Sequence, residues 1–489
     1  MNRKEKLVKG DWMDDLNRGI TEYLKKDYIS FHVPGHKGRR DLLAKISFPA
    51  GDVTELPGLD QLQAPQGVIA QAQRRAAAIF GADESFFLVN GGTVGNQAML
   101  LSIAGEKPKR VLLERQAHRS VSSGLILSGL TPEYLWPVLH PDFNLCLGLD
   151  VEQRLLTGKD IQACHLTYPN YYGAAIHLER MMAWRDAECP ALPMLIDQAH
   201  GAHYLNECFP TGALALGADL VTQSAHKTLG ALTQAALLHR RGSRVRRLAL
   251  KQALDVLQTS SPSYLLMASL ESAVELAGQK QYWEGLREEV EKIHAKVGGF
   301  LRLLGPADEG KYGIWQVDWS KILVNTRPLG VPAAVCVDYL RRRFRIEPEL
   351  WDEENILFVL GIGNTPREVE LLRRGLESLL TKAFQDDRRA AGGSASPFVF
   401  EEARWLQSPP SVRMTPREAF LAPKREVPLA DCPGQICGET VALYPPGIPL
   451  IMMGEEITRE IVEMLVNKRK ASWQGWSDAE RQTLRIIDG

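Results

Sequence analysis

A lysine and an aspartate in this chain have the residue types and settings needed to hold an aldehyde cofactor. Lys227 follows Ser224 and His226, and a lysine amine can form an imine with the aldehyde of pyridoxal phosphate. Asp197 ends the apolar segment 192–196, so its carboxylate is expected at the carboxyl end of a strand, where open α/β sheets bind ligands. A carboxylate there can keep a pyridine nitrogen protonated, which makes the ring an electron sink. The pair therefore predicts pyridoxal phosphate chemistry.

The surroundings of Lys227 also favour this chemistry. The residues around it include Ala225, Leu229 and Ala231, which would remove part of the water from the amine. Desolvation lowers the pKa of a lysine and favours the neutral amine that attacks an aldehyde. We therefore expect Lys227, Asp197 and a cofactor between them to form the reactive centre.

A glycine-rich turn could hold the phosphate group of such a cofactor. Gly92 and Thr93 follow the apolar segment 86–89 and open a helical segment, so backbone N–H groups at a helix start could bind one phosphate. The spacing does not match the G-x-G-x-x-G dinucleotide pattern, and no acidic ribose partner follows at the usual distance. The hydroxyl groups of Thr93 and Ser224 are further candidate donors. A turn of purely structural importance is the alternative interpretation.

Asp197, His200 and His203 could also be interpreted as metal ligands, because carboxylates and imidazoles bind zinc. Their spacing of three residues after a strand does not ensure that they converge. The combination of Asp197 with a lysine anchor favours the organic cofactor, so no metal site is predicted. We expect His200 to orient the ring or Asp197, and His203 to be structural.

Blocks along nearly the whole chain resemble the bacterial ornithine/lysine/arginine decarboxylase family, in its short form without a receiver-like amino-terminal domain. The lysine and aspartate segments both resemble blocks of that family. Further blocks occur in the family's order, namely Phe31–Gly38, Asn90–Thr93, Thr259–Tyr264 and Tyr444–Pro449. The resemblance implies a fold-type-I pyridoxal phosphate enzyme that acts on a basic amino acid as a homodimer or higher oligomer.

The resemblance also implies roles for individual residues. His118 matches the residue that stacks on the pyridine ring, and an imidazole there could also donate a proton near the reactive carbon. His226 matches a contact to the cofactor phosphate. Ser261 and Tyr264 match a block that reaches the active site of a partner subunit. Taken without the resemblance, His118 could be a helix cap and Ser261 could lie in a polar turn.

The chain departs from the family pattern at three positions near the expected pocket. Val94 replaces a hydroxyl residue among the expected cofactor contacts, Asn170 replaces a threonine, and Met453 replaces a proline. The loss of one neutral hydrogen bond costs about 1 kcal/mol, so we expect weaker cofactor binding and not its abolition. Glu455 and Glu439 are candidates to meet the cationic end of the substrate.

The composition excludes several other classes of protein. The 489 residues carry 58 basic and 59 acidic side chains, which gives no broad basic surface for nucleic acid or an anionic membrane. The basic run at residues 341–345 is typical of a solvated helix face. Seven scattered cysteines do not form a secreted disulfide framework. No signal-like segment and no stretch of about 20 apolar residues is found, so a cytoplasmic location is expected.

The alternation of apolar strands and helical segments predicts an α/β fold with three layers around a mostly parallel sheet. The strand candidates are residues 86–89, 110–113, 163–166, 194–196, 220–222 and 235–238. Smaller α+β domains are expected after it. The predicted organisation is an arm at 1–30, a large cofactor domain at 31–268, a small domain at 269–385, a linker at 386–398 and a carboxyl-terminal domain at 399–489.

The expected reaction is the decarboxylation of a basic amino acid, with arginine first and lysine or ornithine next. Lys227, Asp197 and His118 would carry the catalysis, and the product would be a polyamine precursor such as agmatine. An aminotransferase on the same fold is one alternative. A degenerate regulatory protein that binds the cofactor is another, suggested by Val94, Asn170 and Met453.

Overall fold

The computed structural model describes residues 23–46, 48, 50–107, 109–152, 160–381, 384, 410–443, 447–467, 473–478, 480 and 482–488. Residues 1–22 of the expected arm, the expected linker at 386–398, and Tyr444 to Pro446 of the last family-like block lie outside these residues. Within the described part, no helix has the length and apolarity needed to cross a membrane.

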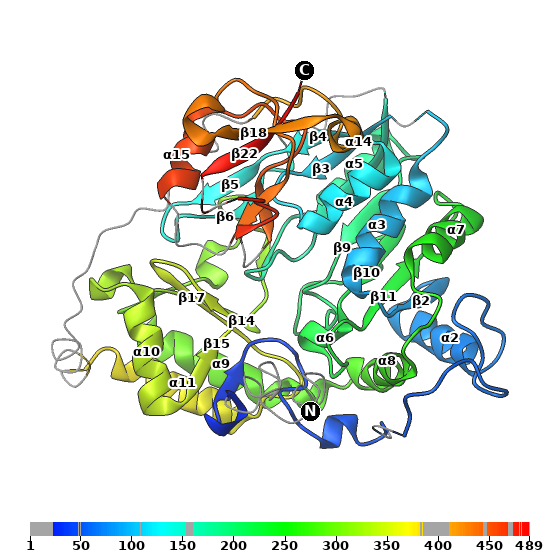
Figure 1. Cartoon of the computed structure of the whole chain (residues 1–489). Coiled ribbons are helices and arrows are strands. Elements are labelled where there is room, and N and C mark those ends of the chain that lie inside the picture. The colour runs from blue at the N-terminus through cyan, green and yellow to red at the C-terminus, as the bar shows by residue number, and fades with distance from the viewer. Residues whose placement is uncertain are drawn as a thin grey trace, which may run out of the picture.

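A seven-stranded sheet forms the centre of the large domain (Figure 1), in the order β2-β11-β10-β9-β7-β3-β4. The strands are β2 (Glu84–Leu88), β3 (Arg110–Glu114), β4 (Thr131–Leu135), β7 (Ile161–Thr167), β9 (Met194–Asp197), β10 (Leu220–Gln223) and β11 (Ala236–Arg240). Strands β4, β3, β7, β9 and β10 are parallel, whereas β11 is antiparallel to both β10 and β2. The six strand candidates and the mostly parallel sheet are confirmed.

Helices cover both faces of this sheet and give the expected three layers. One face packs against α3 (Gly91–Ile103), α4 (Arg119–Ser128) and α7 (Arg247–Leu257), and the other against α2 (Val68–Phe80), α5 (Leu178–Glu188) and α8 (Tyr264–Ala277). Most residues of β3, β9, β10 and β11 are buried, because helices cover both faces of the sheet. The short α6 (Ala225–Thr228) follows the carboxyl end of β10.

The small domain is built on a four-stranded antiparallel sheet. Its strands are β12 (Arg302–Leu303), β14 (Lys321–Asn325), β17 (Asn355–Val359) and β16 (Leu350–Trp351), and its helices are α9 (Glu284–Val297), α10 (Ala333–Phe344) and α11 (Pro366–Ser378). Strand β1 (Ile29–Phe31) pairs in parallel with β15 (Ile346–Pro348) of this domain. The expected boundaries at residues 30 and 268 therefore fall inside β1 and α8.

The carboxyl-terminal domain has a core of its own. It contains α14 (Pro416–Leu421), β18 (Lys424–Pro428), β19 (Val441–Leu443), β20 (Ile448–Ile451), α15 (Arg459–Asn467), β21 (Trp473–Gln474) and β22 (Thr483–Ile487). Short pairs join other segments, namely the hairpin of β5 (Pro137–His140) with β6 (Leu145–Leu149) and the pair of β8 (Ala174–Ala175) with β13 (Gln316–Val317). The latter pair ties the large domain to the small one.

Candidate active site

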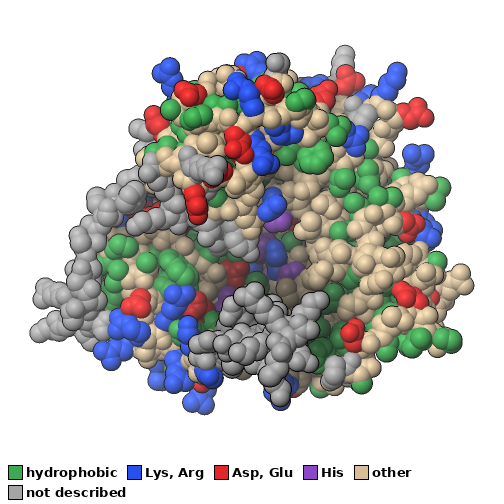
Figure 2. All heavy atoms as spheres, viewed as in Figure 1, with side chains coloured by type: hydrophobic (Ala, Val, Ile, Leu, Met, Phe, Trp, Pro, Cys, Tyr) green, Lys and Arg blue, Asp and Glu red, His purple; other side chains and the backbone are tan. Residues whose placement is uncertain are grey.

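Polar side chains gather at the carboxyl ends of β9 and β10. Asp197 is the last residue of β9 and is paired in register with Thr222 of β10, and Lys227 follows β10 on α6. Carboxyl ends of neighbouring parallel strands meet at one edge of a sheet, which is where such folds bind ligands. Figure 2 shows a hollow in this face of the molecule, with histidine and Lys or Arg side chains at its base.

The Lys227 amine lies against His200, with 2.8 Å between its Nζ and the His200 Nε2 atom. Burial lowers the pKa of Lys227, and the carboxylates of Asp197 and Glu349 oppose that shift only in part. An amine with a lowered pKa is more often neutral near pH 7 and is a better nucleophile. The site therefore provides the partly desolvated lysine that an aldehyde cofactor requires.

Asp197 is buried and held by two donors. Its Oδ1 atom accepts from the Ala199 backbone N–H at 3.0 Å, and its Oδ2 atom accepts from Asn96 Nδ2 at 2.6 Å. Asn96 lies on α3, and its Oδ1 atom is 3.3 Å from Nε2 of His165. Asn96 was missed at the sequence level, although a buried polar residue inside an otherwise apolar helical segment is a usable signal.

His118 is the N-cap residue of α4, and its ring has a defined tautomer. The Ser120 backbone N–H donates to Nδ1 at 3.2 Å, and the Ser120 Oγ atom lies 2.8 Å from the same nitrogen. Asn96 Nδ2 donates to this hydroxyl oxygen at 2.9 Å, which leaves the Ser120 hydroxyl proton for His118. Because Nδ1 accepts, the neutral ring carries its proton on Nε2. Burial and the nearby Lys227 amine lower the pKa of His118 to about 4.

The start of α3 leaves backbone donors open beside Ser224. A Cβ atom at Gly92 would lie 2.8 Å from the Ser224 Oγ atom, so glycine allows the close approach of the two segments. Asn90 does not cap the helix with its side chain, and its Oδ1 atom instead accepts from the Thr259 N–H at 3.1 Å. Thr93 is exposed at this helix start. Open N–H groups and a hydroxyl fit a phosphate group.

The structure gives Val94 a different environment from the one expected. Its side chain is buried in an apolar cluster with Leu88, Met99 and Met452, so an expected side-chain contact to a cofactor at this position lacks support. Val94 can still contribute its backbone N–H, near the start of α3, to the binding of a phosphate.

His226 and the amino-terminal block lie together. The His226 Nδ1 atom donates to the Ala235 carbonyl at 3.0 Å, and burial lowers the pKa of this histidine to about 4. The Gly35 N–H donates to the His226 carbonyl at 2.7 Å, and a Cβ at Gly35 would lie 2.6 Å from the Leu229 carbonyl oxygen. The segment His32 to Gly38 thus packs against α6 of its own chain.

The small domain adds charged groups that the sequence interpretation missed. Lys321 opens β14, and its Nζ atom is 3.4 Å from Nδ1 of His200. Glu349 accepts from the Val33 backbone N–H at 2.7 Å and from the Tyr171 hydroxyl. A lysine at the start of an otherwise apolar strand was the available sequence signal for Lys321. Glu349 had no comparable local signal, because its partners come from distant segments.

The segment with the expected subunit-crossing residues lies near the start of α3. Ser261 is exposed, and the Tyr264 hydroxyl donates to the Asp60 carbonyl at 2.7 Å. The Gln63 side chain donates to the carbonyl of Thr259 at 2.6 Å. The role of Ser261 and Tyr264 in a partner's site stays a prediction.

The two candidate substrate carboxylates are buried in structural contacts. Glu455 forms an ion pair with Arg115 at 2.9 Å, and both side chains are almost fully buried. Glu439 accepts from the backbone N–H groups of Ser477 and Arg485, each at 3.0 Å. These contacts fix the carboxyl-terminal domain, and they give no support to a substrate role for Glu455 or Glu439 within this chain.

Three other singled-out residues have structural partners. Asn170 forms a turn in which its Oδ1 atom accepts from the N–H groups of Tyr172 and Ala174. The Met453 N–H donates to the Thr440 hydroxyl. The His203 Nε2 atom lies 3.0 Å from the Asp318 Oδ2 atom, which is the kind of contact that a structural histidine makes. Among the described residues, no group of three His, Cys, Asp or Glu side chains is arranged to hold a metal ion.

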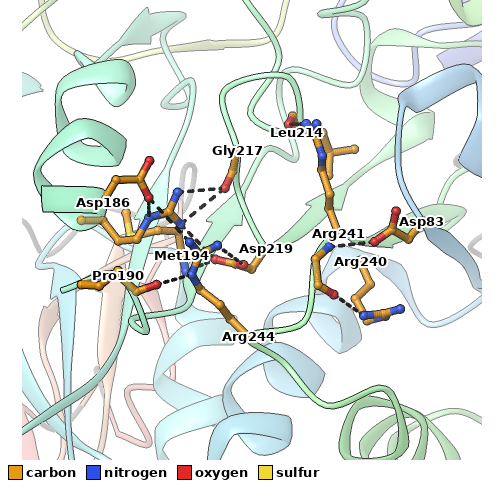
Figure 3. Close-up of polar contacts among 12 residues, drawn as sticks. Asp83, Asp186, Pro190, Met194, Leu214, Gly217, Asp219, Arg240, Arg241 and Arg244 are labelled. Atoms are coloured by element: carbon orange, nitrogen blue, oxygen red, sulfur yellow. Dashed lines mark hydrogen bonds and ion pairs between the residues drawn. The ribbon is translucent and has the colours of Figure 1, made fainter.

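A second buried polar cluster lies at the opposite, amino-terminal ends of β9 and β10 (Figure 3). Asp219 accepts from the Met194 backbone N–H at 2.8 Å and forms ion pairs with Arg185 at 3.3 Å and Arg244 at 3.1 Å. Arg185 also pairs with Asp186. This cluster joins α5 to the sheet and to the turn after β11.

The arrangement at the carboxyl ends fits pyridoxal phosphate. Lys227 would take the aldehyde, Asp197 would face the ring nitrogen, and the start of α3 with Ser224 would take the phosphate. The chemistry of this donor set matches each part of the cofactor. Lys227 lies close enough to His118 and His200 to lower the pKa of both histidines, after the larger effect of their burial.

Comparison with known proteins identifies related sequences. The family model "Orn/Lys/Arg decarboxylase, major domain" matches residues 15–299, and the model "Orn/Lys/Arg decarboxylase, C-terminal domain" matches residues 401–472. An uncharacterized protein of Bacillus subtilis, YaaO, is 35% identical over 92% of this chain and 93% of its own length. An arginine decarboxylase of Halalkalibacterium halodurans is 30% identical over 96% of this chain and 97% of its own.

Solved structures resemble the fold over the same extent. The lysine decarboxylase LdcF of Francisella novicida superimposes with a TM-score of 0.73, covering 97% of this chain and 83% of its own, at 18% sequence identity. At that identity the likeness concerns the fold. It confirms the expected fold class, a three-layer α/β domain followed by a small domain and a carboxyl-terminal domain.

Proposed function

The chain belongs to the Orn/Lys/Arg decarboxylase family, and we propose that it removes the α-carboxylate of arginine to give agmatine, with lysine and ornithine as the next candidates. The activity class of the family is pyridoxal phosphate-dependent decarboxylation of a basic amino acid. The choice of arginine rests on one observation: a relative named arginine decarboxylase is 30% identical to this chain over nearly the full length of both proteins. We further propose that the product feeds polyamine synthesis and that the protein is cytoplasmic.

When bound, pyridoxal phosphate supplies an aldehyde for covalent attachment and a protonated ring that accepts the electron pair left as CO2 departs. Lys227 would hold the aldehyde and exchange with the substrate amine. Asp197 would keep the proton on the ring nitrogen, and Asn96 and the Ala199 N–H fix its carboxylate for this task. The start of α3 and Ser224 would bind the phosphate and orient the ring.

The protein groups also decide which residue returns a proton to Cα. His118 is held neutral, because its Nδ1 atom accepts from Ser120 and its pKa lies near 4. A neutral imidazole N–H is a weak acid, whereas burial lowers the pKa of the Lys227 amine and makes its proton easier to release. Of the two proton donors considered, we assign the step to Lys227 and leave His118 to contact the ring.

The experiment is a comparison of arginine, lysine and ornithine with the purified protein at saturating pyridoxal phosphate. Released CO2 and the three amines, namely agmatine, cadaverine and putrescine, are measured directly. We expect the highest kcat/KM for arginine. A keto acid in place of CO2 would identify an aminotransferase, and no turnover on any of the three would favour a degenerate regulatory protein.

We also propose a homodimer in which Ser261 and Tyr264 complete the partner's site. A chain with Lys227→Ala is mixed with a chain carrying Ser261→Ala and Tyr264→Phe. Each chain alone should be inactive or weak, and mixed dimers should regain part of the activity because one of their two sites is intact. Verified mixed dimers without recovery would contradict the shared site.

A further inference from the structure

Asn96 lies on α3 at a place where this helix packs closely against the sheet and against α4. Glycine residues allow the close packing. A Cβ atom at Gly95 would overlap the Thr222 side chain of β10, and one at Gly124 of α4 would lie 2.6 Å from the Leu100 Cδ1 atom of α3. Asn96 is only 2% exposed, and buried amides normally have partners for their donors and acceptors.

The Asn96 amide contacts three other buried side chains. Its Nδ2 atom donates to Asp197 Oδ2 at 2.6 Å and to Ser120 Oγ at 2.9 Å. Its Oδ1 atom is 3.3 Å from Nε2 of His165 on β7. A side-chain amide has two N–H donors, so both are used, one toward β9 and one toward α4, while the oxygen faces β7.

The Asp197 carboxylate decides which way the amide points. An ionised carboxylate only accepts hydrogen bonds, so an amide oxygen at 2.6 Å would be repelled, and the Nδ2 group must face Asp197. In this orientation the amide oxygen accepts, and His165 donates to it from Nε2. The second Nδ2 proton then goes to the hydroxyl oxygen of Ser120.

The Ser120 hydroxyl extends this direction to His118. Because its oxygen accepts from Asn96, its proton is directed to the His118 Nδ1 atom at 2.8 Å, and the Ser120 backbone N–H also donates there at 3.2 Å. Burial lowers the pKa of His118 to about 4, so the ring is neutral near pH 7 and has a single N–H, at Nε2. The donations thus run from His165 through Asn96 to Asp197 and to His118.

This chain joins the two residues that we propose to meet the cofactor ring, Asp197 at its nitrogen and His118 on its face. Buried hydrogen bonds in a chain polarise one another, so a reversal at one member affects the next. The proton position on His118 should therefore depend on what stands at position 197.

We propose that the Asp197 carboxylate, acting through Asn96 and Ser120, decides which nitrogen of His118 carries the proton, and that Asn96 is the positioning residue that makes this link. One N–H of the amide holds the carboxylate, and the other directs the Ser120 hydroxyl. The roles of Asp197 and His118 at the ring rest on the proposed function, whereas the link itself can be tested without any cofactor.

The first test is Asn96→Asp in the cofactor-free protein. Two carboxylates this close share a proton, so residue 96 can still donate to Asp197. Its oxygen now accepts from the Ser120 hydroxyl, which leaves the Ser120 oxygen to accept from His118. We expect the His118 proton to move from Nε2 to Nδ1.

The second test is Asp197→Asn, which reverses the same chain from its other end. The Ala199 backbone N–H donates to Oδ1 of residue 197, so the new amide keeps its oxygen there and turns its NH2 group toward Asn96. The Asn96 amide must then rotate and present its oxygen to Ser120. We again expect the His118 proton at Nδ1.

The two variants change the local charge in opposite directions. Asn96→Asp adds an acid, whereas Asp197→Asn removes one. A direct effect of charge on the imidazole would therefore shift its protonation in opposite senses, whereas the hydrogen-bonded link predicts the same movement in both. Each variant decides by itself if the other does not fold.

The measurement is ¹⁵N NMR of protein labelled at histidine, because protonated and unprotonated ring nitrogens have distinct chemical shifts. The His118 signals are identified by their loss in His118→Asn. In the wild-type protein we expect a proton on Nε2 and none on Nδ1. In both test variants the Nδ1 signal should move to the range of a protonated nitrogen.

The matched control is Asn170→Asp, which makes the same replacement in the same domain. The Asn170 side chain contacts the Leu147 carbonyl and the backbone N–H groups of Tyr172 and Ala174, and these contacts are separate from the chain that reaches His118. The His118 signals should stay as in the wild-type protein. An equal movement of the His118 proton in this control would overturn the link.

Other results are equally decisive. A proton on Nδ1 of His118 in the wild-type protein, or an unmoved proton in either test variant when it is folded, would overturn the inference. Opposite movements in the two variants would assign the effect to charge alone. Borohydride reduction that fixes the cofactor on a lysine other than 227 would contradict the proposed function instead, and that result is recognised by the modified peptide.

Discussion

The two ends of strands β9 and β10 carry polar clusters of opposite character. At the amino ends, Asp219 is surrounded by Arg185, Arg244 and a backbone N–H, so charges of opposite sign are matched within the chain. At the carboxyl ends, Lys227 and Lys321 lie against one imidazole, and both have lowered pKa values. The first cluster is complete without a ligand, whereas the second gains from a bound anion.

This difference separates a cluster with matched charges from the proposed cofactor site. Buried ion pairs with matched partners hold elements together, whereas shifted pKa values in a hollow mark sites where a ligand completes the charge balance. A phosphate and a substrate carboxylate are the anions that the proposed reaction brings to the carboxyl ends. The comparison can be tested by changing each end separately.

The largest expected effect is at Lys227. Lys227→Ala should lower kcat by about 10⁴-fold or more, because covalent attachment of the cofactor is lost. The visible absorption band of the cofactor adduct should be absent, and borohydride should leave no cofactor on residue 227. Thermal stability should change little. A reduced adduct on another lysine in the wild-type protein would contradict the assignment.

The matching change at the other end is Asp219→Ala. It removes the buried carboxylate that Arg185 shares with Arg244 and leaves Arg185 its more exposed partner Asp186, and breaking a buried pair costs up to about 3 to 5 kcal/mol. We expect a lower free energy of unfolding in denaturant titrations, with KM and kcat of the remaining folded enzyme close to wild type. Asp488→Ala is the control, because the pair of Asp488 with Arg425 is exposed and is worth less than about 1 kcal/mol. Equal losses for both variants would contradict the contrast.

Asp197→Ala returns to the carboxyl ends and should have a smaller effect than Lys227→Ala. The variant should still bind some cofactor covalently, because Lys227 is present, but kcat should fall by about 100-fold or more since nothing holds the ring nitrogen protonated. Spectroscopic titration of the cofactor and kcat are measured on the same sample. Near-normal kcat would mean that Asp197 is structural only.

The smallest expected effect is a pH dependence of the unfolding free energy, caused by buried lysines near the carboxyl ends of β9 and β10. The pKa of Lys37 is lowered by burial to about 7 and that of Lys321 to about 8, whereas an unfolded lysine titrates near 10.4. The unfolded chain therefore binds more protons than the folded chain between about pH 7 and 10, and stability of the cofactor-free protein should rise with pH. The slope is at most about 1.4 kcal/mol per pH unit for each amine.

Replacement variants show which end causes that slope. Lys37→Met should flatten the rise in unfolding free energy between pH 7 and 10. Asp219→Ala should lower the whole curve and keep its slope, because its arginine partners do not titrate in this range. If the unfolding free energy of the wild-type protein did not change between pH 7 and 10, burial would not lower the pKa values of Lys37 and Lys321 as described.

Much of the fold could be predicted because the signals are local. Short apolar runs marked β2, β9 and β10, and the positions of Gly92, Asp197 and Lys227 at or just after the ends of these runs placed them at one edge of the sheet. The direction of β11 could not be predicted, since the pattern of buried residues is the same in parallel and antiparallel strands. Strand β4 was also not predicted.

The parts of the site that were missed depend on contacts between distant segments. Glu455 was expected to meet the substrate, and its ion pair with Arg115, which lies 340 residues away in the sequence, could not be predicted. Lys321 contacts His200 across 121 residues. Such pairs are decided by how the domains pack, and a single sequence contains no local pattern that reports them.

The placement of the amino-terminal block has a consequence for the order of events during synthesis. Lys37 donates to the carbonyl of Val359, 322 residues later in the chain, and β1 pairs with β15 of the same late segment. Contacts with so large a sequence separation form late. Strand β1, the first described strand to be synthesised, therefore cannot pair until β15 of the small domain has also been synthesised. An unfinished chain that lacks β15 and Val359 cannot make these contacts, so the amino-terminal block reaches its final packing only after the small domain has been synthesised.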